Sequence, residues 1–169
     1  MRPFKHCPWC GNSLAIRAMS AADSDDTRER LACTATDCSY VHYDNPTPVV
    51  AAIVQREDSV VLVQNKGWPG SFFGLMSGFL ERNEHPDEAV ARELHEELGL
   101  VPLSQTFLGH YAFDGMNQLI LAYHMVVEGE WTLGREIAAA KAIPIAKLRA
   151  WSVGTGPALQ DWLVRVRGH

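Results

Sequence analysis

The segment from Gly78 to Leu100 constrains what this 169-residue chain can fold into more than any other stretch. Gly78 is followed, with five residues between, by Glu84, and after seven more by Arg92-Glu93-Leu94-His95-Glu96-Glu97-Leu98-Gly99-Leu100. Nine of these positions form a spaced pattern of glycine, glutamate, arginine and apolar residues. At average residue usage, such a pattern arises at a given starting point with a chance on the order of 10⁻⁹. The segment therefore carries a specific structural or chemical requirement.

Signals at both ends of the pattern define a helix. Pro86 suits the first helical turn because it has no N–H to leave unpaired and its φ is preset, and Gly99 can adopt the left-handed conformation that ends a helix. The sequence therefore predicts a helix from about Pro86 to Leu98. One side of this helix carries an apolar stripe that can pack on a sheet, formed by Ala89, Val90, Leu94 and Leu98.

Three glutamates on the predicted helix form the candidate chemical site. Glu93, Glu96 and Glu97 are spaced i, i+3 and i+4, so their carboxylates lie on or beside one face. The alternative is a solvated acidic face, but the like charges repel each other near the negative end of the helix, where a bound cation relieves the repulsion. Oxygen ligands of this kind suit Mg²⁺ or Mn²⁺, which bind jointly with substrate phosphates. We therefore predict attack of a metal-activated water on a phosphorus atom.

Arg92 directly precedes this acidic face, and Glu84 is its candidate partner. A guanidinium can hold a carboxylate through two parallel hydrogen bonds. We predict that Arg92 orients Glu84 in this way and that both residues support catalysis. The alternative is an ordinary ion pair on the surface.

Four cysteines in two close pairs occupy the first part of the chain. Two residues separate Cys7 from Cys10, and four separate Cys33 from Cys38. This spacing is typical of a tetrahedral Zn²⁺ site, and the rival interpretation is two disulfides in a secreted domain. No apolar secretory segment precedes Cys7, which favours the reducing cytoplasm and therefore zinc. A closed four-thiolate site leaves no position for water, so this zinc is expected to be structural.

Composition excludes several classes of partner. The chain has 15 basic and 20 acidic residues, a formal net charge of −5, and seven of the acids lie between Gly78 and Leu100. No basic stripe exists for duplex nucleic acid, and no run of about eighteen apolar residues exists to span a membrane. A hydrophobic fraction of 47% favours an ordered globule.

The pattern from Gly78 to Leu100 resembles the Nudix box, the signature of hydrolases that cleave nucleoside diphosphates linked to another moiety. The resemblance implies an α/β protein, an α/β/α sandwich with a mixed sheet, in which the box forms a loop–helix–loop metal site. It implies Glu93 and Glu97 as the main metal ligands and Glu96 as a further ligand or water partner. Two more ligands are implied, the backbone carbonyl of Ser77 and Glu136, for which an ordinary exposed glutamate is the alternative.

A cysteine module directly before such a box resembles the NADH pyrophosphatase branch of that family. The resemblance implies a zinc ribbon over residues 1–45, a hydrolase domain over 46–169, and a homodimer as an allowed state. The branch's Ser-Gln-Pro-Trp-Pro-Phe-Pro specificity run is not matched. Ser104 and Gln105 keep its first two residues, and the rest of the run is absent.

Apolar runs predict strands around the box, at 48–54, 60–64 and 118–127, and a closing helix at 157–166. Aromatic residues between these elements are candidates to stack on a nucleotide base, with a place in the core as the alternative for each. They are Trp68 and Phe72 in a glycine-rich loop, and Tyr111 and Phe113 in a further strand.

These observations predict a cytoplasmic, Mg²⁺- or Mn²⁺-dependent hydrolase with a small-molecule nucleotide substrate. It is expected to cleave the pyrophosphate bond of a nucleoside diphosphate derivative, with NAD(H)-like and ADP-ribose-like compounds favoured. A nucleoside triphosphate pyrophosphohydrolase is the alternative within the enzyme class. A regulator that senses a nucleotide without cleaving it is the alternative outside that class.

Overall fold

A computed structural model describes residues 4–20, 27–68 and 70–168 of the chain. The chain divides into two compact units, Met1–Asn45 and Pro46–His169. Each unit is described by itself below. No helix in the described part of the chain combines the length and apolarity needed to cross a bilayer.

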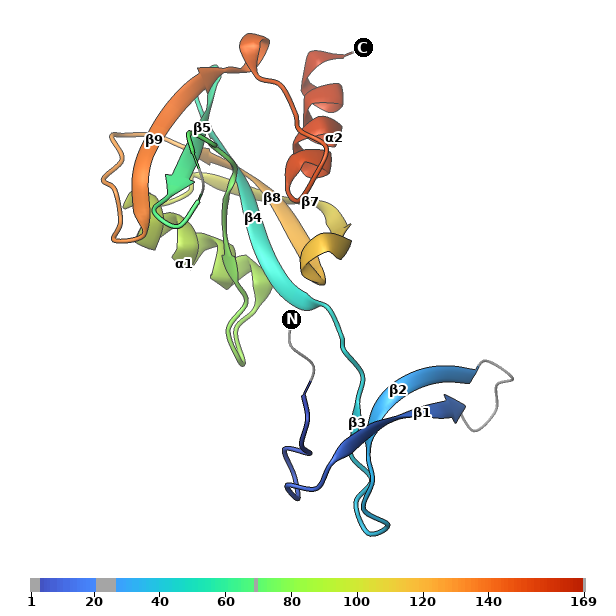
Figure 1. The fold of residues 1–169 in the computed structure, drawn as a ribbon. Coiled ribbons are helices and arrows are strands. Elements are labelled where there is room, and N and C mark those ends of the chain that lie inside the picture. Colours follow the sequence, from blue (N-terminus) through green and yellow to red (C-terminus); the bar gives the residue numbers. More distant parts are fainter. Residues whose placement is uncertain (1–3, 21–26, 69, 169) are drawn as a thin grey trace. The chain divides into compact units, whose positions relative to one another are not determined.

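The N-terminal unit is a small antiparallel sheet with almost no apolar core. Its strands pair in the order β1-β2-β3 (Figure 1), and they span Leu14–Ser20, Thr27–Cys33 and Val41–His42. Among the described residues of this unit, only Cys7, Ala32 and Cys33 are buried hydrophobics. A module of this size cannot be held together by so little buried apolar surface, so it needs a cross-link or a metal.

The second unit is built on a mixed sheet ordered β7-β8-β4-β5-β9, with β6 also paired to β4. Strands β4 and β8 are parallel, and all other neighbours are antiparallel. Strand β6 pairs with the first half of β4, and β5 pairs with its second half. The strands are β4 (Thr47–Arg56), β5 (Ser59–Asn65), β6 (Met76–Phe79), β7 (Ser104–Phe113), β8 (Gln118–Val127) and β9 (Ile137–Pro144).

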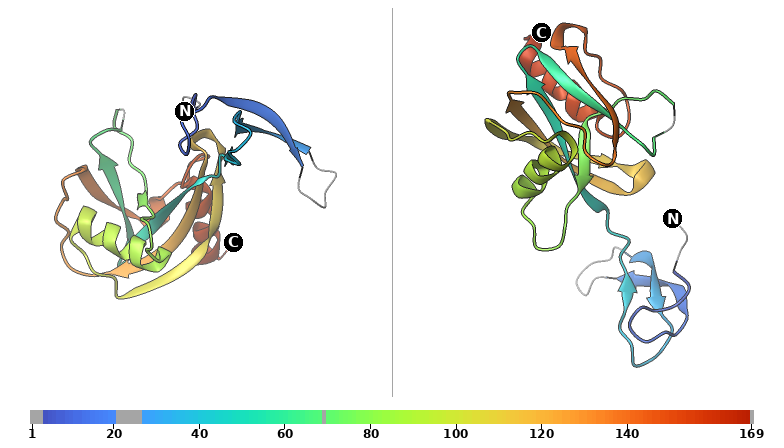
Figure 2. Two further views of the ribbon diagram at one scale, coloured as in Figure 1. Left: turned by 90° about the horizontal axis from the view of Figure 1, so that it is seen from below. Right: turned by 90° about the vertical axis from the view of Figure 1, so that its left-hand side faces the viewer.

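Two helices cover opposite faces of this sheet (Figures 1 and 2), α1 (Pro86–Leu98) and α2 (Gly156–Arg167). Strand β4 is buried on both faces, and alternate residues serve alternate helices. Val50, Ala52 and Val54 belong to the core that includes α1, whereas Ile53 belongs to the core that includes α2. The predicted α/β/α sandwich with a mixed sheet is therefore confirmed. Two short 3₁₀ helices, Asp114–Met116 and Ile145–Lys147, lie in connections.

Candidate metal-dependent active site

Helix α1 occupies the predicted range and is capped at both ends. Pro86 is in its first turn, and a capping box at its start has the backbone N–H of His85 donating to Glu88 Oε2 at 3.2 Å. Gly99 ends the helix with a φ of 66°, and its N–H donates to the carbonyl of His95 at 2.8 Å. These caps fix where the three glutamates of the last turns lie relative to the sheet.

The glutamates line a cavity of about 550 Å³ beside β6. The structure brings together residues from α1, from β6, from the end of β5 and from the segment before β9. All candidate metal ligands of the box, and Glu136 from outside it, are among them. The lining residues are Asn65, Ser77, Gly78, Phe79, Glu81, Arg92, Glu93, Glu96, Glu97, Arg135 and Glu136.

Glu97 is the most unusual carboxylate of this cavity. Its residue surface is 6% exposed, and its Oε2 is buried without a hydrogen-bond partner among the described residues. Burial, and then the charges of Glu93, Glu136 and Glu96, raise the pKa of Glu97 to about 8. A buried carboxylate oxygen without a donor, on a residue that lines an acid-lined cavity, is what a divalent cation needs, so these residues fit such an ion.

Arg92 binds three other carboxylates of the box. Its Nε and Nη2 donate to the two carboxylate oxygens of Glu84 at 2.7 and 3.1 Å, which is the predicted two-bond geometry. Its Nη1 donates to Glu93 Oε1 at 2.9 Å and to Glu96 Oε2 at 3.2 Å. The hydrogen bond from Arg92 holds the pKa of Glu84 below its usual value. Burial raises the pKa of Glu93, although Arg92 opposes this effect.

Gly78 leaves the space that Glu93 fills. A Cβ atom added at Gly78 would lie 2.0 Å from both Cδ and Oε1 of Glu93. Any side chain at this position would therefore displace the carboxylate. This contact explains in physical terms why the pattern begins with glycine, a reason that the spacing alone did not supply.

The segment before β9 reaches the cavity because it binds the C-terminal carbonyls of α1. The N–H of Thr132 donates to Leu98 O, and that of Gly134 donates to Glu97 O, both at 2.9 Å. A Cβ at Gly134 would lie 2.0 Å from a helix carbonyl oxygen, so only glycine allows this approach. The contact places Glu136 beside the acids of the helix.

A second cavity of about 420 Å³ adjoins the first and shares Asn65, Ser77, Gly78 and Phe79 with it. Among the described residues that line it, none carries a charge. The candidate base-stacking residues Trp68, Phe72 and Phe113 are in its lining. Sequence inspection missed its other residues, which are Val49, Gly74, Leu75, Met116, Gln118, Ile120, Trp151, Val153, Gly154 and Thr155.

Three aromatic rings of this cavity pack against one another through Phe72, whereas Tyr111 lies outside the cavity lining. The ring centroid of Phe72 is 5.3 Å from that of Trp68 and 5.8 Å from that of Trp151. Tyr111 is not in the lining; it packs against a small core cluster, and its hydroxyl donates to Asp161 Oδ2 at 3.0 Å. The structure therefore brings three of the four candidate aromatics together.

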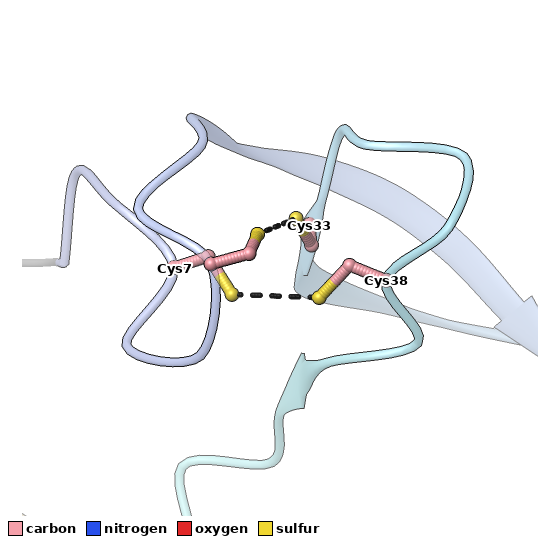
Figure 3. Close-up of side chains that lie close together, drawn as sticks. Cys7, Cys33 and Cys38 are labelled. Carbon is pink, nitrogen blue, oxygen red and sulfur yellow. Dashed lines mark hydrogen bonds between the residues drawn. The ribbon is translucent and has the colours of Figure 1, made fainter.

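The four cysteines of the N-terminal unit converge, and Figure 3 shows three of them, Cys7, Cys33 and Cys38, pointing toward one another. Their sulfur atoms all lie within 4.8 Å of one another, and the Cys7–Cys38 and Cys10–Cys33 sulfur pairs are 3.7 and 3.4 Å apart. All four are free thiols, so the disulfide alternative is not observed. A tetrahedral zinc–thiolate site has sulfur atoms about 3.8 Å apart, so the cluster fits zinc. Hydrogen bonds from Asn12 lower the pKa of Cys10 to about 6, which favours a thiolate there, whereas the pKa values of Cys33 and Cys38 are raised.

The sandwich and its carboxylate-lined cavity are those of a class of hydrolases that use divalent metal ions. The chain belongs to the Nudix hydrolase family, because the NUDIX domain model matches residues 45–161. The Nudix N-terminal model, a zinc ribbon, matches residues 5–44. The family resemblance of the box and the enzymatic class are thereby confirmed.

Individual relatives are distant. The NAD-capped RNA hydrolase NudC of Vibrio parahaemolyticus is 24% identical over 120 residues, which are 71% of this chain and 42% of that protein. The ADP-ribose pyrophosphatase of Methanocaldococcus jannaschii is 36% identical over 74 residues, 43% of this chain and 44% of that protein. This chain therefore spans less than half the length of these curated relatives. The crystal structure of a NUDIX hydrolase from Nitrosomonas europaea has a similar fold, with a TM-score of 0.73 at 23% identity over 98% of this chain and 94% of that chain.

Proposed function

We propose that this protein is a Mg²⁺- or Mn²⁺-dependent pyrophosphohydrolase that cleaves the diphosphate linkage of a nucleoside diphosphate derivative, either NAD(H)-like or ADP-ribose-like. The observation that carries the proposal is the buried Oε2 of Glu97. This atom has no partner among the described residues, and its residue lines a cavity together with four further glutamates. The adjoining charge-free aromatic cavity supports a substrate with a planar group on one side of the diphosphate.

We assign the metal ligands to the acid-lined cavity. Glu93 and Glu97 are the main ligands, and Glu96, Glu136 and the backbone carbonyl of Ser77 are further ones. Divalent ions held there lower the pKa of a bound water and neutralise phosphate charge. In the N-terminal unit, which we assign as a zinc ribbon over residues 1–45, the ligands of a structural Zn²⁺ are Cys7, Cys10, Cys33 and Cys38.

The other residues of the box orient these acids. Arg92 and Glu84 are positioning residues, because the guanidinium is held by Glu84 and in turn holds Glu93 and Glu96. The side chain of Glu96 is 58% exposed, whereas that of Glu93 is 14% exposed. This exposure suits Glu96 to meet the attacking water and to take its proton at a carboxylate oxygen.

The substrate class is supported by two independent observations. Trp68, Phe72 and Phe113 line the cavity beside the acids, and aromatic side chains stack on nucleotide bases. The two curated relatives described above are named for NAD-capped RNA and ADP-ribose, and both of these compounds contain an adenosine diphosphate. We therefore place a planar base in the aromatic cavity and the diphosphate against the glutamates.

The test is a product assay of zinc-replete protein with Mg²⁺ or Mn²⁺ against NADH, NAD, ADP-ribose, diadenosine polyphosphates and nucleoside triphosphates. Release of AMP from NADH, NAD or ADP-ribose is the expected result. Release of pyrophosphate from triphosphates alone would replace the proposed substrate class. Stoichiometric nucleotide binding without product after long incubation would replace hydrolysis by sensing.

Substitution of Gly78 by Ala is expected to weaken Mn²⁺ binding about 10- to 100-fold and to lower hydrolysis at least as much. The added Cβ would occupy the place of the Glu93 carboxylate. Titration with Mn²⁺ by electron paramagnetic resonance measures the change. Gly67→Ala is the matched control, because a Cβ there would meet no atom within 4 Å. If Gly78→Ala bound Mn²⁺ as tightly as the wild type and Gly67→Ala do, the role given to Glu93 would be refuted.

Substitution of Trp68 by Leu is expected to raise KM for the preferred substrate about ten-fold, with kcat little changed. The indole supplies a stacking surface remote from the bond that is cleaved, so its loss weakens substrate binding alone. Steady-state kinetics separate the two constants. Trp9→Leu, which changes a 71% exposed indole in the other unit, is the control. An unchanged KM in Trp68→Leu would remove this residue from the site.

A further inference from the structure

Asn65 shares an unusual property with Glu97. Among the described residues, the only two buried side-chain nitrogen or oxygen atoms without a hydrogen-bond partner are Glu97 Oε2 and Asn65 Oδ1. Both residues line the same cavity. A buried acceptor left without a donor destabilises a fold, so its persistence indicates that a ligand supplies the donor. The proposed cation supplies a partner for Glu97 Oε2, but no described residue of the box supplies a donor for Asn65 Oδ1.

The backbone directs Asn65 to this position. It is the last residue of β5, and the pairing of β5 with β9 shifts there, since Gln64 is opposite Ala139 and Asn65 is opposite Ile137. Such a bulge changes the direction of a side chain and is frequent beside active sites. Beyond it, the N–H of Lys66 donates to the carbonyl of Glu136 at 2.9 Å, which ties the end of β5 to the acidic cavity.

Asn65 also lies where the two cavities meet. It lines both of them, together with the β6 residues Ser77, Gly78 and Phe79. If the diphosphate lies against the glutamates and the base lies among the aromatic rings, the group at this junction is the sugar that joins them. The hydroxyl groups of a ribose are hydrogen-bond donors. A neutral carboxamide can accept from them without repelling the neighbouring phosphates, as a carboxylate would.

We propose that Asn65 is a substrate-binding residue whose Oδ1 accepts a hydrogen bond from a ribose hydroxyl at the junction of the two cavities. This inference deepens the proposed function and rests on its placement of the base and diphosphate. It predicts that the site distinguishes ribonucleotides from their deoxy analogues.

The test measures binding rather than turnover, with ADP, 2′-deoxy-ADP and 3′-deoxy-ADP as probes. Isothermal titration in the presence of Mg²⁺ compares the wild-type chain with Asn65→Leu, which is close in shape but cannot accept a hydrogen bond. The wild-type chain is expected to bind one deoxy analogue about ten-fold more weakly than ADP. Asn65→Leu is expected to bind ADP as weakly as that analogue and to show no further loss with it.

A melting curve of the ligand-free protein separates this role from a structural one. Removing a buried acceptor that has no partner should leave the melting temperature of Asn65→Leu equal to or above that of the wild type, whereas loss of a structural hydrogen bond would lower it. Asn65→Ala provides a second variant if leucine does not fit the site.

Two results with the variants would overturn the inference: wild-type affinity for ADP in both variants, or an equal loss of affinity for ADP and for both deoxy analogues. The latter result would point to a bound water as the donor. Failure of the proposed function is a distinct outcome. The wild-type chain could bind ADP with the expected hydroxyl preference and yet release no product in the assay above. That result would support the inference about Asn65 and contradict the proposed hydrolysis. A wild-type chain that binds none of the three probes would overturn the inference.

Discussion

Replacement of Glu97 by Gln is expected to lower hydrolysis by about 10³-fold or more while the protein stays folded. Glutamine keeps the shape of the side chain and removes the charge that holds the cation. The rate of product release at saturating Mg²⁺ measures the effect, and Glu128→Gln, on an exposed position after β8, is the control. Full activity in Glu97→Gln would exclude the proposed metal site.

The same variant has a second expected effect, on the pH dependence of stability without metal. Because the pKa of Glu97 rises from 4.5 in the unfolded chain to about 8 in the folded one, its protonated form favours the folded state. That contribution is complete below pH 4.5 and is lost as the pH rises through about 8.

Glutamine cannot lose this proton. In EDTA, the melting temperature of Glu97→Gln should therefore fall less than that of the wild type between about pH 5 and 9. This interval is roughly the one over which Glu97 of the wild type loses its proton. Mg²⁺ should stabilise the wild type most at the alkaline end, because the ion replaces the missing proton, and should stabilise the variant little. An equal change of melting temperature with pH in the two proteins would show that Glu97 is not desolvated as the structure has it.

Replacement of Cys33 by Ser is expected to abolish zinc binding and to unfold the N-terminal unit. Its described residues bury only three hydrophobic side chains, two of them cysteines of the cluster. Structural zinc supplies about 10–16 kcal/mol of binding free energy in comparable modules, which is more than this unit can draw from its apolar core. Residues 46–169 have hydrophobic core clusters of their own and should stay folded.

Metal analysis by plasma mass spectrometry and a two-dimensional NMR spectrum test this expectation. The variant should contain no zinc and should lose the dispersed resonances of residues 4–45, while those of the second unit remain. Ser39→Ala, which changes an exposed residue next to Cys38, is the control and should keep both. A dispersed spectrum of the N-terminal unit in a zinc-free variant would show that the cluster is dispensable for its fold.

Most of the local features of this protein were predictable because their determinants are close together in the sequence. The ends of α1 follow from a proline and a glycine, and the shared face of its acids follows from the helical period. The cysteine spacing likewise predicts the cluster that the structure shows. The apolar runs of β4 and β5 mark the central strands, since both faces of the sheet are covered.

Strand β9 is a counterexample. Its alanine-rich sequence has little strand preference of its own, and it becomes a strand because β5 offers a free edge to pair with. Tyr111 is another counterexample. Its place in the alternating pattern of β7 is as predicted, but its hydroxyl donates a hydrogen bond to Asp161, fifty positions away. In both cases a distant segment decides the outcome.

The sequence by itself therefore determined the family, the metal-binding helix and the cysteine cluster, because turn chemistry, helical periodicity and ligand spacing act within a few residues. Only the tertiary structure decided which distant groups complete the site. Gly134 brings Glu136 to the end of α1 through a backbone hydrogen bond, and a bulge brings Asn65 to the junction of the cavities. Trp151 joins Phe72 across a long sequence separation. Such contacts depend on how the chain packs over the sheet, for which no local pattern exists.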